Sequence, residues 1–304
     1  MVPRSRGGGR PARSARLSSP GPFSPTHDVA ESRDGTPIAF FEVPTPTGAA
    51  KATEVRPPLL LVHGAAADHT TWRISGPRLA RRRLVYAMDR RGRGASGDAT
   101  AAAYSIEREY EDVAVVAEAL AARTGRPAVD VAGHSYGGRA ALGASLATEA
   151  IRRVVVYEGA PVPPGVSYRS QELVDGVRAA LEQGDNEAAL STFLQGIVGL
   201  SDAAMEAYRR EAVWPARVAA APTILREIEA EAGPAASIDA LGRSTDPVLL
   251  VLGSISRSPF RIGTDALAER LADARVEVIK GAAHAAHHTH VDKFVGIVEQ
   301  FLDR

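Results

Sequence analysis

A strand, a sharp turn and a helix follow one another in the middle of the chain, and this arrangement constrains the fold most. The apolar run 129–132 leads into Gly133-His134-Ser135-Tyr136-Gly137, and a helical segment begins near Arg139. Glycines beside Ser135 permit a turn so tight that a side chain would collide with the neighbouring backbone. Such a turn lifts the serine hydroxyl above the carboxyl edge of a parallel sheet, at the positive end of the next helix. The pattern predicts a nucleophile at Ser135, and the alternative is a glycine-rich turn with a passive serine.

Other short apolar runs predict the rest of the sheet. A β-hairpin at the sheet edge is expected from runs 29–32 and 38–43, which are joined by Asp34-Gly35. Buried parallel strands are expected at residues 59–62, 84–88, 129–132, 154–157, 248–252 and 276–279. Helical segments separate these runs, the clearest being 106–124 with Ser105 as N-cap and Gly125 as its end. The alternation predicts an α/β fold with a mostly parallel, twisted sheet flanked by helices.

One interval breaks the alternation of strand and helix. Residues 162–245 contain no strand-like run, and their apolar residues recur at helical spacing. We expect a helical cap there, inserted into a core formed by residues 27–161 and 246–304. Residues 1–26 are rich in Arg, Gly, Pro and Ser, a composition typical of a disordered tail. A targeting arm, a solvated tail or a start codon placed too early would each account for this segment.

Composition narrows the classes of function. The chain of 304 residues has no cysteine, which excludes disulfides, thiolate zinc sites and a cysteine nucleophile. Its formal net charge is +0, so we expect no nucleic-acid partner and no anionic-membrane partner. No apolar run approaches the roughly 18 residues of a membrane-spanning helix. Because no apolar stretch follows the N-terminal arginines, we expect no secretory signal. We therefore expect a cytoplasmic location.

The partners of Ser135 should come from the carboxyl ends of other strands, where ligands bind in open α/β sheets. His284 follows the last apolar run, where the general base for Ser135 is expected. Three more histidines follow within the next six residues, which raises the alternative of a metal site. We expect no metal, because no carboxylate is interleaved among them and Ser135 already requires an imidazole.

The acidic partner of His284 requires an unusual assignment. The turn after run 248–252 contains no carboxylate, Asp246 precedes that strand, and Asp265 falls in a predicted helix. Glu158 instead follows the run beside the nucleophile strand, from where its carboxylate can reach the imidazole. We therefore predict Glu158 as the acid; the alternative is a surface carboxylate that ends a strand.

Two further loops lie at the same predicted edge. The first buried strand ends in His63-Gly64-Ala65, and the N–H of Ala65 is expected to pair with that of Tyr136 as an oxyanion hole. A plain glycine turn is the alternative. The loop 89–97 is rich in arginine and glycine but lacks the Lys-Ser/Thr ending of a phosphate loop. We expect its arginines to tie neighbouring loops together.

From about residue 29 to its end, the chain resembles the α/β-hydrolase superfamily. The matching motifs are His63-Gly64, Gly92-Arg93-Gly94-Ala95-Ser96, Gly133–Gly137 and the late His284. The resemblance implies the α/β-hydrolase fold and the chain order serine, acid, histidine. An acid after the earlier strand is similar to some haloalkane dehalogenases and zearalenone-type lactonases. Dehalogenases of that kind and epoxide hydrolases carry aspartate at the turn, so Ser135 argues against both chemistries.

Together these features predict a serine hydrolase that cleaves a small-molecule carboxylic ester or lactone through an acyl-enzyme, without a cofactor. The same residues would also serve amide or C–C bond hydrolysis or cofactor-free perhydrolysis. A non-catalytic small-molecule binding protein on the same fold is an alternative, as is an elimination or isomerisation enzyme that uses His284 as a base. Candidate pocket residues, of a kind more often found in a core, are His63, His134, Phe193, Met205, Tyr208 and Trp214.

Overall fold

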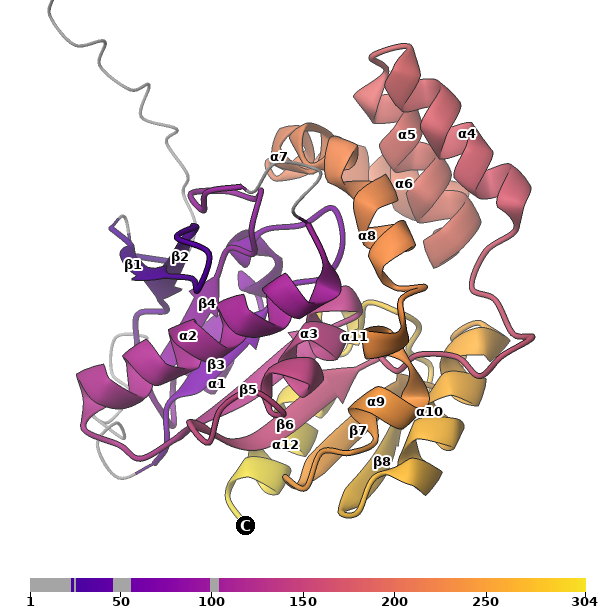
Figure 1. The fold of residues 1–304 in the computed structure, drawn as a ribbon. Helices are drawn as coiled ribbons and strands as arrows, with labels where there is room; N and C mark the ends of the chain where they lie inside the picture. The colour runs from indigo at the N-terminus through magenta and orange to yellow at the C-terminus, as the bar shows by residue number, and fades with distance from the viewer. Residues whose placement is uncertain (1–22, 25, 46–55, 99–103) are drawn as a thin grey trace, which may run out of the picture.

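The computed structural model describes residues 23–24, 26–45, 56–98 and 104–304, which form an α/β fold around one eight-stranded sheet (Figure 1). The strand order is β1-β2-β4-β3-β5-β6-β7-β8. The strands are β1 (Asp28–Glu31), β2 (Pro37–Glu42), β3 (Leu59–Val62), β4 (Val85–Met88), β5 (Val129–His134), β6 (Ile151–Tyr157), β7 (Val248–Gly253) and β8 (Ala274–Ile279). β2 pairs antiparallel with β1 and β4, and the other neighbours pair in parallel. The predicted edge hairpin and mostly parallel sheet are confirmed.

Helices connect the strands. They are α1 (Gly76–Leu79), α2 (Ile106–Thr124), α3 (Tyr136–Ala144), α4 (Gln171–Glu182), α5 (Asn186–Thr192), α6 (Asp202–Arg209), α7 (Trp214–Ala219), α8 (Ile224–Ala230), α9 (Ile238–Leu241), α10 (Ser258–Arg270), α11 (Ala286–Thr289) and α12 (Val291–Leu302). Short 3-10 helices occupy His69–Trp72, Ala221–Thr223 and Pro234–Ala236, and a π-helix occupies Phe193–Val198. Helix α2 has the predicted bounds, because the Ser105 side chain accepts the Arg108 N–H and Gly125 adopts a left-handed φ of 64°.

Each face of the sheet buries its own apolar cluster. Leu60 and Val62 of β3 belong to one cluster with residues of α2, α3 and α10, whereas Leu59 and Leu61 belong to the other with α1 and α12. Successive side chains of a strand point to opposite faces, and helices cover both faces here. The continuous apolar runs in the sequence follow from this arrangement.

A third apolar cluster forms the core of the cap. Helices α4 to α9 lie in sequence between β6 and β7, in the interval 162–245 for which the sequence predicts a helical insertion. Helices α4 to α8 gather at one end of the sheet (Figure 1). Their buried side chains include Val177, Leu190, Phe193, Met205 and Trp214. The cap therefore has a packed interior of its own, separate from the two apolar clusters of the sheet.

Two residues near the end of the predicted N-terminal tail have described contacts. Most of the predicted tail 1–26 lies outside the described residues, but Phe23 and Ser24 contact the core. The Phe23 ring packs edge-on against His69 with ring centroids 4.8 Å apart, and the Ser24 N–H donates to the Glu42 carbonyl at 3.0 Å. An aromatic contact and a backbone hydrogen bond attach these two residues to the core, and the disorder of the tail stays a prediction. Within the described ranges, no helix is both long enough and apolar enough to cross a membrane.

Candidate active site

Ser135 occupies the sharp turn between β5 and α3. Its φ of 53° and ψ of −124° are rare for a residue other than glycine. A Cβ on Gly133 would lie 2.2 Å from the Gly137 carbonyl oxygen, and one on Gly137 would lie 2.2 Å from the His63 carbonyl oxygen. Only glycine therefore fits at these two positions. The packing holds the serine in its strained conformation and presents its side chain to a cavity.

Two backbone N–H groups near Ser135 come from the loop after β3 and from the start of α3. Ala65 and Tyr136 both line the cavity, and neither N–H donates a hydrogen bond to the part of the protein that the structure describes. The N–H of Tyr136 belongs to the first turn of α3, which has no intrahelical acceptor. Both groups are thus free to bind an anionic oxygen.

His63, predicted as a pocket residue, lies beneath this loop and not in the cavity. It is fully buried, Nε2 accepts the Arg90 N–H at 3.0 Å, and Nδ1 donates to the Gly64 carbonyl at 2.8 Å. Burial, followed by the nearby Arg90, lowers the pKa of His63 well below its usual value, so the ring is neutral. Its position corrects the prediction: His63 holds the Gly64-Ala65 loop and does not contact the cavity.

Glu158 and His284 form a buried pair in the wall of the cavity. His284 Nδ1 and Glu158 Oε2 are 2.7 Å apart, and Glu158 is 3% exposed. The other carboxylate oxygen, Oε1, accepts the Gly253 N–H at 2.7 Å and the Ser256 hydroxyl. The turn after β7, which lacks a carboxylate, thus supplies donors to a carboxylate from β6. Asp265 lies within α10, and Asp246 precedes β7.

The loop that carries His284 is held on both sides. Tyr157 Oη donates to the Ala283 carbonyl and accepts the Ala286 N–H at 2.7 Å. The ring of His134, the second histidine predicted for the pocket, donates from Nε2 to the His284 carbonyl at 2.8 Å. His134 therefore orients the loop from below and does not line the cavity, which corrects its predicted role.

His284 and Ser135 line one cavity, although no hydrogen bond joins their side chains in the described residues. The cavity measures about 50 Å³, far below the roughly 300 Å³ of a typical ligand pocket. Its apolar wall consists of Ala65, Phe193, Ile197, Val198, Ile224, Ile228 and Phe260. A drug-sized ligand does not fit this volume as the surrounding side chains are arranged.

Of the apolar cap residues predicted to line a pocket, only Phe193 does so. Trp214 packs against Tyr208 with ring centroids 5.6 Å apart, and Met205 is 1% exposed within the cap core. These three residues belong to the interior of the cap, the alternative that the sequence left open.

The other histidines near His284 are structural. His288 donates from Nε2 to the Thr71 carbonyl at 2.7 Å, and the His287 ring packs against His134 with centroids 4.4 Å apart. Burial lowers the pKa of His287 well below its usual value and that of His288 to about 4. Across the described ranges, no three His, Asp or Glu side chains are arranged to hold a metal ion.

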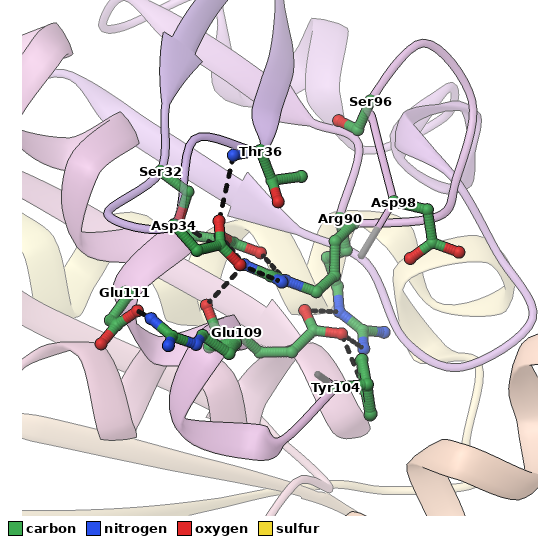
Figure 2. Close-up of polar contacts among 12 residues, drawn as sticks. Ser32, Asp34, Thr36, Arg90, Ser96, Asp98, Tyr104, Glu109 and Glu111 are labelled. Carbon is green, nitrogen blue, oxygen red and sulfur yellow. Dashed lines mark hydrogen bonds and ion pairs between the residues drawn. The ribbon is translucent and has the colours of Figure 1, made fainter. Parts of the chain in front are cut away.

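The arginine-rich loop ties the core to the cap. Figure 2 shows the Glu109 carboxylate between Arg90 and Tyr104, with Arg90 contacting both carboxylate oxygens at 2.9 and 2.6 Å. Arg90 and Arg93 also donate to Glu227 of α8, each at 2.5 Å. The Arg90 guanidinium lies 4.3 Å from the centre of the Tyr136 ring. These contacts fit the tying role expected for the loop.

The cavity is also lined by four charged residues of the cap and the core that were not predicted from the sequence: Arg139, Arg169, Glu227 and Glu231. Glu231 bridges Arg139 of α3 at 3.1 Å and Arg169 of the segment before α4 at 2.9 Å. A signal existed for Glu227, because a carboxylate falls on the same helical face as Ile224 and Ile228. A charge within an apolar stripe marks a buried polar site.

Comparisons with known proteins agree with the fold. A model described as "Alpha/beta hydrolase family" matches residues 59–297. The structure of an alpha/beta hydrolase from Sphaerobacter thermophilus DSM 20745 has a TM-score of 0.72 and 26% identity, and the match covers 90% of this chain and 99% of that chain. Esterase RhEst1 from Rhodococcus sp. ECU1013 has a TM-score of 0.70 and 21% identity, with 91% and 98% covered.

An enol-lactonase from Burkholderia xenovorans LB400 has a TM-score of 0.69 and 19% identity, and the match covers 91% of this chain and 100% of that chain. Among curated proteins, no match was found. The family match spans most of the sheet, the turn at Ser135 and the loop of His284. The chain belongs to the α/β-hydrolase family.

Proposed function

We propose that the protein is a serine hydrolase that cleaves a small-molecule carboxylic ester or lactone through an acyl-enzyme on Ser135. The observation that carries the proposal is the 2.7 Å contact between Glu158 and His284 in the wall of the cavity that Ser135 also lines. A base oriented by a buried carboxylate, next to a serine on a strained turn, matches the requirements of nucleophilic catalysis. Esterases and a lactonase among the structural neighbours support this substrate class.

In the first half-reaction, Ser135 Oγ attacks the carbonyl carbon while His284 Nε2 takes the hydroxyl proton. Glu158 keeps the proton on Nδ1 and stabilises the imidazolium that forms. The N–H groups of Ala65 and Tyr136 donate to the oxyanion, an interaction worth several kcal/mol in a site without water. Collapse of the intermediate transfers the proton from His284 to the leaving alcohol and leaves the acyl group on Ser135.

The second half-reaction uses water in place of the alcohol. His284 takes a proton from water as it attacks the acyl carbon, and returns that proton to Ser135 Oγ when the carboxylic acid leaves. In a lactone the alcohol and the acid belong to one molecule, so a single open-chain hydroxy acid is released. No step requires a metal or a cofactor.

A panel of p-nitrophenyl esters and macrocyclic lactones, assayed with wild type and Ser135→Ala, tests the proposal. We expect hydrolysis by wild type and a loss of at least about a thousandfold in the variant, since only the oxyanion hole and binding remain. Near-full activity in Ser135→Ala would refute the role of the serine. Ligand binding without turnover by wild type would instead favour a non-catalytic binding protein.

A further inference from the structure

Glu227 of cap helix α8 lines the cavity, and one oxygen of its carboxylate makes no hydrogen bond to the part of the chain that the structure describes. Glu227 is 1% exposed, and its Oε1 accepts hydrogen bonds from Arg90 and Arg93. Its Oε2 has no hydrogen-bonding partner within the described residues. Buried acceptors are satisfied in the great majority of cases, so an exception in a cavity wall requires an explanation.

The charges around Glu227 balance without any ligand. Arg90 and Arg93 face Glu109 and Glu227, two cations against two carboxylates. An ammonium group on a substrate would add an uncompensated charge to this buried cluster, and a carboxylate would be repelled by Oε2. The group that fits Oε2 is an uncharged donor, such as a hydroxyl or an amide N–H.

The position of Glu227 indicates which part of a substrate carries that donor. Arg90, which contacts Glu227, also donates to the Gly64 carbonyl at 3.1 Å and lies over the Tyr136 ring. Gly64 and Tyr136 belong to the two segments that supply the oxyanion N–H groups. The leaving alcohol departs toward His284, because it receives its proton there. Glu227 therefore adjoins the segments of the oxyanion hole, and we assign its donor to the acyl part because the leaving alcohol departs toward His284.

We infer that Glu227 is a specificity-determining residue that accepts a hydrogen bond from a hydroxyl or amide N–H on the acyl part of the substrate. This inference rests on the proposed function and narrows its substrate class to esters or lactones of hydroxylated or amide-bearing acids. Without such a donor, closure of the cap leaves Oε2 buried and unsatisfied. Substrates that carry the donor remove this penalty in the closed, reactive complex.

Matched ethyl esters of hexanoic acid test the inference. The panel contains the unsubstituted ester, its 2-, 3- and 6-hydroxy derivatives, the corresponding methoxy derivatives and monoethyl adipate. With wild type, we expect kcat/KM for at least one hydroxy ester to exceed that of its methoxy partner by about ten- to a hundredfold. A methoxy oxygen only accepts hydrogen bonds, so it cannot satisfy Oε2.

The variant Glu227→Gln sharpens the test. Arg90 and Arg93 should hold the amide oxygen, so the NH2 group replaces Oε2 as a donor toward the cavity. The hydroxy-to-methoxy ratio should then fall to about one or below. Glu109→Gln is the matched control, because it disturbs the same Arg90 but does not line the cavity, and it should retain the wild-type ratio. Circular dichroism and melting temperatures establish that each variant folds.

The outcomes separate the two claims. If Ser135→Ala retains activity, or wild type hydrolyses no ester of any panel, the proposed function is overturned. If Ser135 is required but hydroxy, methoxy and unsubstituted esters react equally at every position, the inference alone is overturned. A preference for monoethyl adipate, or a hydroxy preference that persists in Glu227→Gln, would overturn it as well.

Discussion

Glu158 adopts a backbone conformation that is rare for a residue with a long side chain. Its φ of 49° lies in the left-handed region, where an L-residue is strained by about 1–3 kcal/mol. Donors from Gly253, Ser256 and His284 hold the carboxylate from both sides. The strain aims a side chain from the end of β6 at a histidine loop two strands farther along the sheet.

We expect Glu158→Gln to preserve the fold and to lower kcat by about a thousandfold or more. An amide cannot stabilise the imidazolium, and its NH2 group would face donors on at least one side. Asp246→Asn and Asp265→Asn are the controls and should remain within about tenfold of wild type. Kinetics are compared with circular dichroism for all three variants. If Asp265→Asn is inactive and Glu158→Gln is active, the acid follows β7.

Tyr157 is expected to act as a positioning residue for His284. Tyr157→Phe removes both hydrogen bonds that its hydroxyl makes to the loop 283–286, so kcat should fall about ten- to a hundredfold. KM should change little, because Tyr157 does not line the cavity. Tyr86→Phe, which also removes a buried tyrosine hydroxyl, should leave kcat within about twofold. A Tyr157→Phe enzyme with unchanged kcat would contradict the positioning role.

The sequence predicts the polar residues at strand ends better than it predicts the pocket. Ser135, Glu158 and His284 each follow an apolar run, and parallel strands bring their carboxyl ends to one edge. The structure brings Glu158 and His284 into contact, whereas their catalytic roles stay predictions. Pocket residues depend on how the cap helices are rotated and packed. The spacing of Trp214 and Met205 shows that they are buried, but not whether they face a cavity.

At the scale of elements, the cap is fastened over the site by a bridge between segments distant in sequence. Glu231 at the end of α8 contacts both Arg139 of α3 and Arg169 of the segment before α4. The cavity that Ser135 lines and an adjoining cleft of about 510 Å³ share four lining residues: Arg139, Tyr168, Arg169 and Glu231. This bridge lies between the small cavity of Ser135 and a cleft large enough for a substrate chain.

Arg169→Ala should join the cavity to the cleft and relax selectivity for acyl chain length. We expect the ratio of kcat/KM for p-nitrophenyl dodecanoate over butyrate to rise about fivefold or more. Arg178→Ala is the matched control, because it removes an exposed ion pair to Glu229 of α8. Neither Arg178 nor Glu229 lines the cavity or the cleft. An unchanged ratio in Arg169→Ala would show that substrates reach Ser135 by another route.

The boundaries of elements were predicted to within a few residues, and the differences have local causes. β6 begins at Ile151 instead of residue 154, because Arg152 and Arg153 interrupt the apolar run without interrupting the strand. Arg152 pairs with Asp130 of neighbouring β5 at 2.8 Å, so a charged residue is accommodated in the sheet. Such pairing between strands cannot be predicted from a single run.

At the scale of the whole molecule, buried neutral histidines make stability depend on pH. His288 has a pKa of about 4, lowered by burial and by the nearby Arg73, and burial also lowers the pKa of His287. An unfolded chain takes up these protons near pH 6.5, whereas the folded protein does not until the pH is lower. The contribution of these histidines to the free energy of unfolding is therefore complete above pH 6.5. It decreases toward pH 4, by up to about 1.4 kcal/mol per pH unit for each histidine.

His288→Gln should flatten this dependence. The glutamine amide can still donate to the Thr71 carbonyl, so the loss of stability at pH 8 should be about 1 kcal/mol or less. Between pH 6.5 and 4.5, the free energy of unfolding should fall less steeply in the variant than in wild type. The two slopes should differ by about 1.4 kcal/mol per pH unit. Urea denaturation at several pH values measures both slopes. If the free energy of unfolding depends on pH equally in the two proteins, His288 takes up its proton in the folded state as readily as in the unfolded chain.

In the proposed reaction Ser135 is an activated nucleophile, and covalent labelling measures this reactivity. Intact-mass spectrometry after incubation with a fluorophosphonate should show one adduct on wild type, located at Ser135 by peptide mapping. Ser135→Ala should remain unlabelled, and Glu158→Gln should react much more slowly, because its imidazole accepts the serine proton less readily. A wild-type protein that folds and remains unmodified, or one labelled at another residue, would contradict the account.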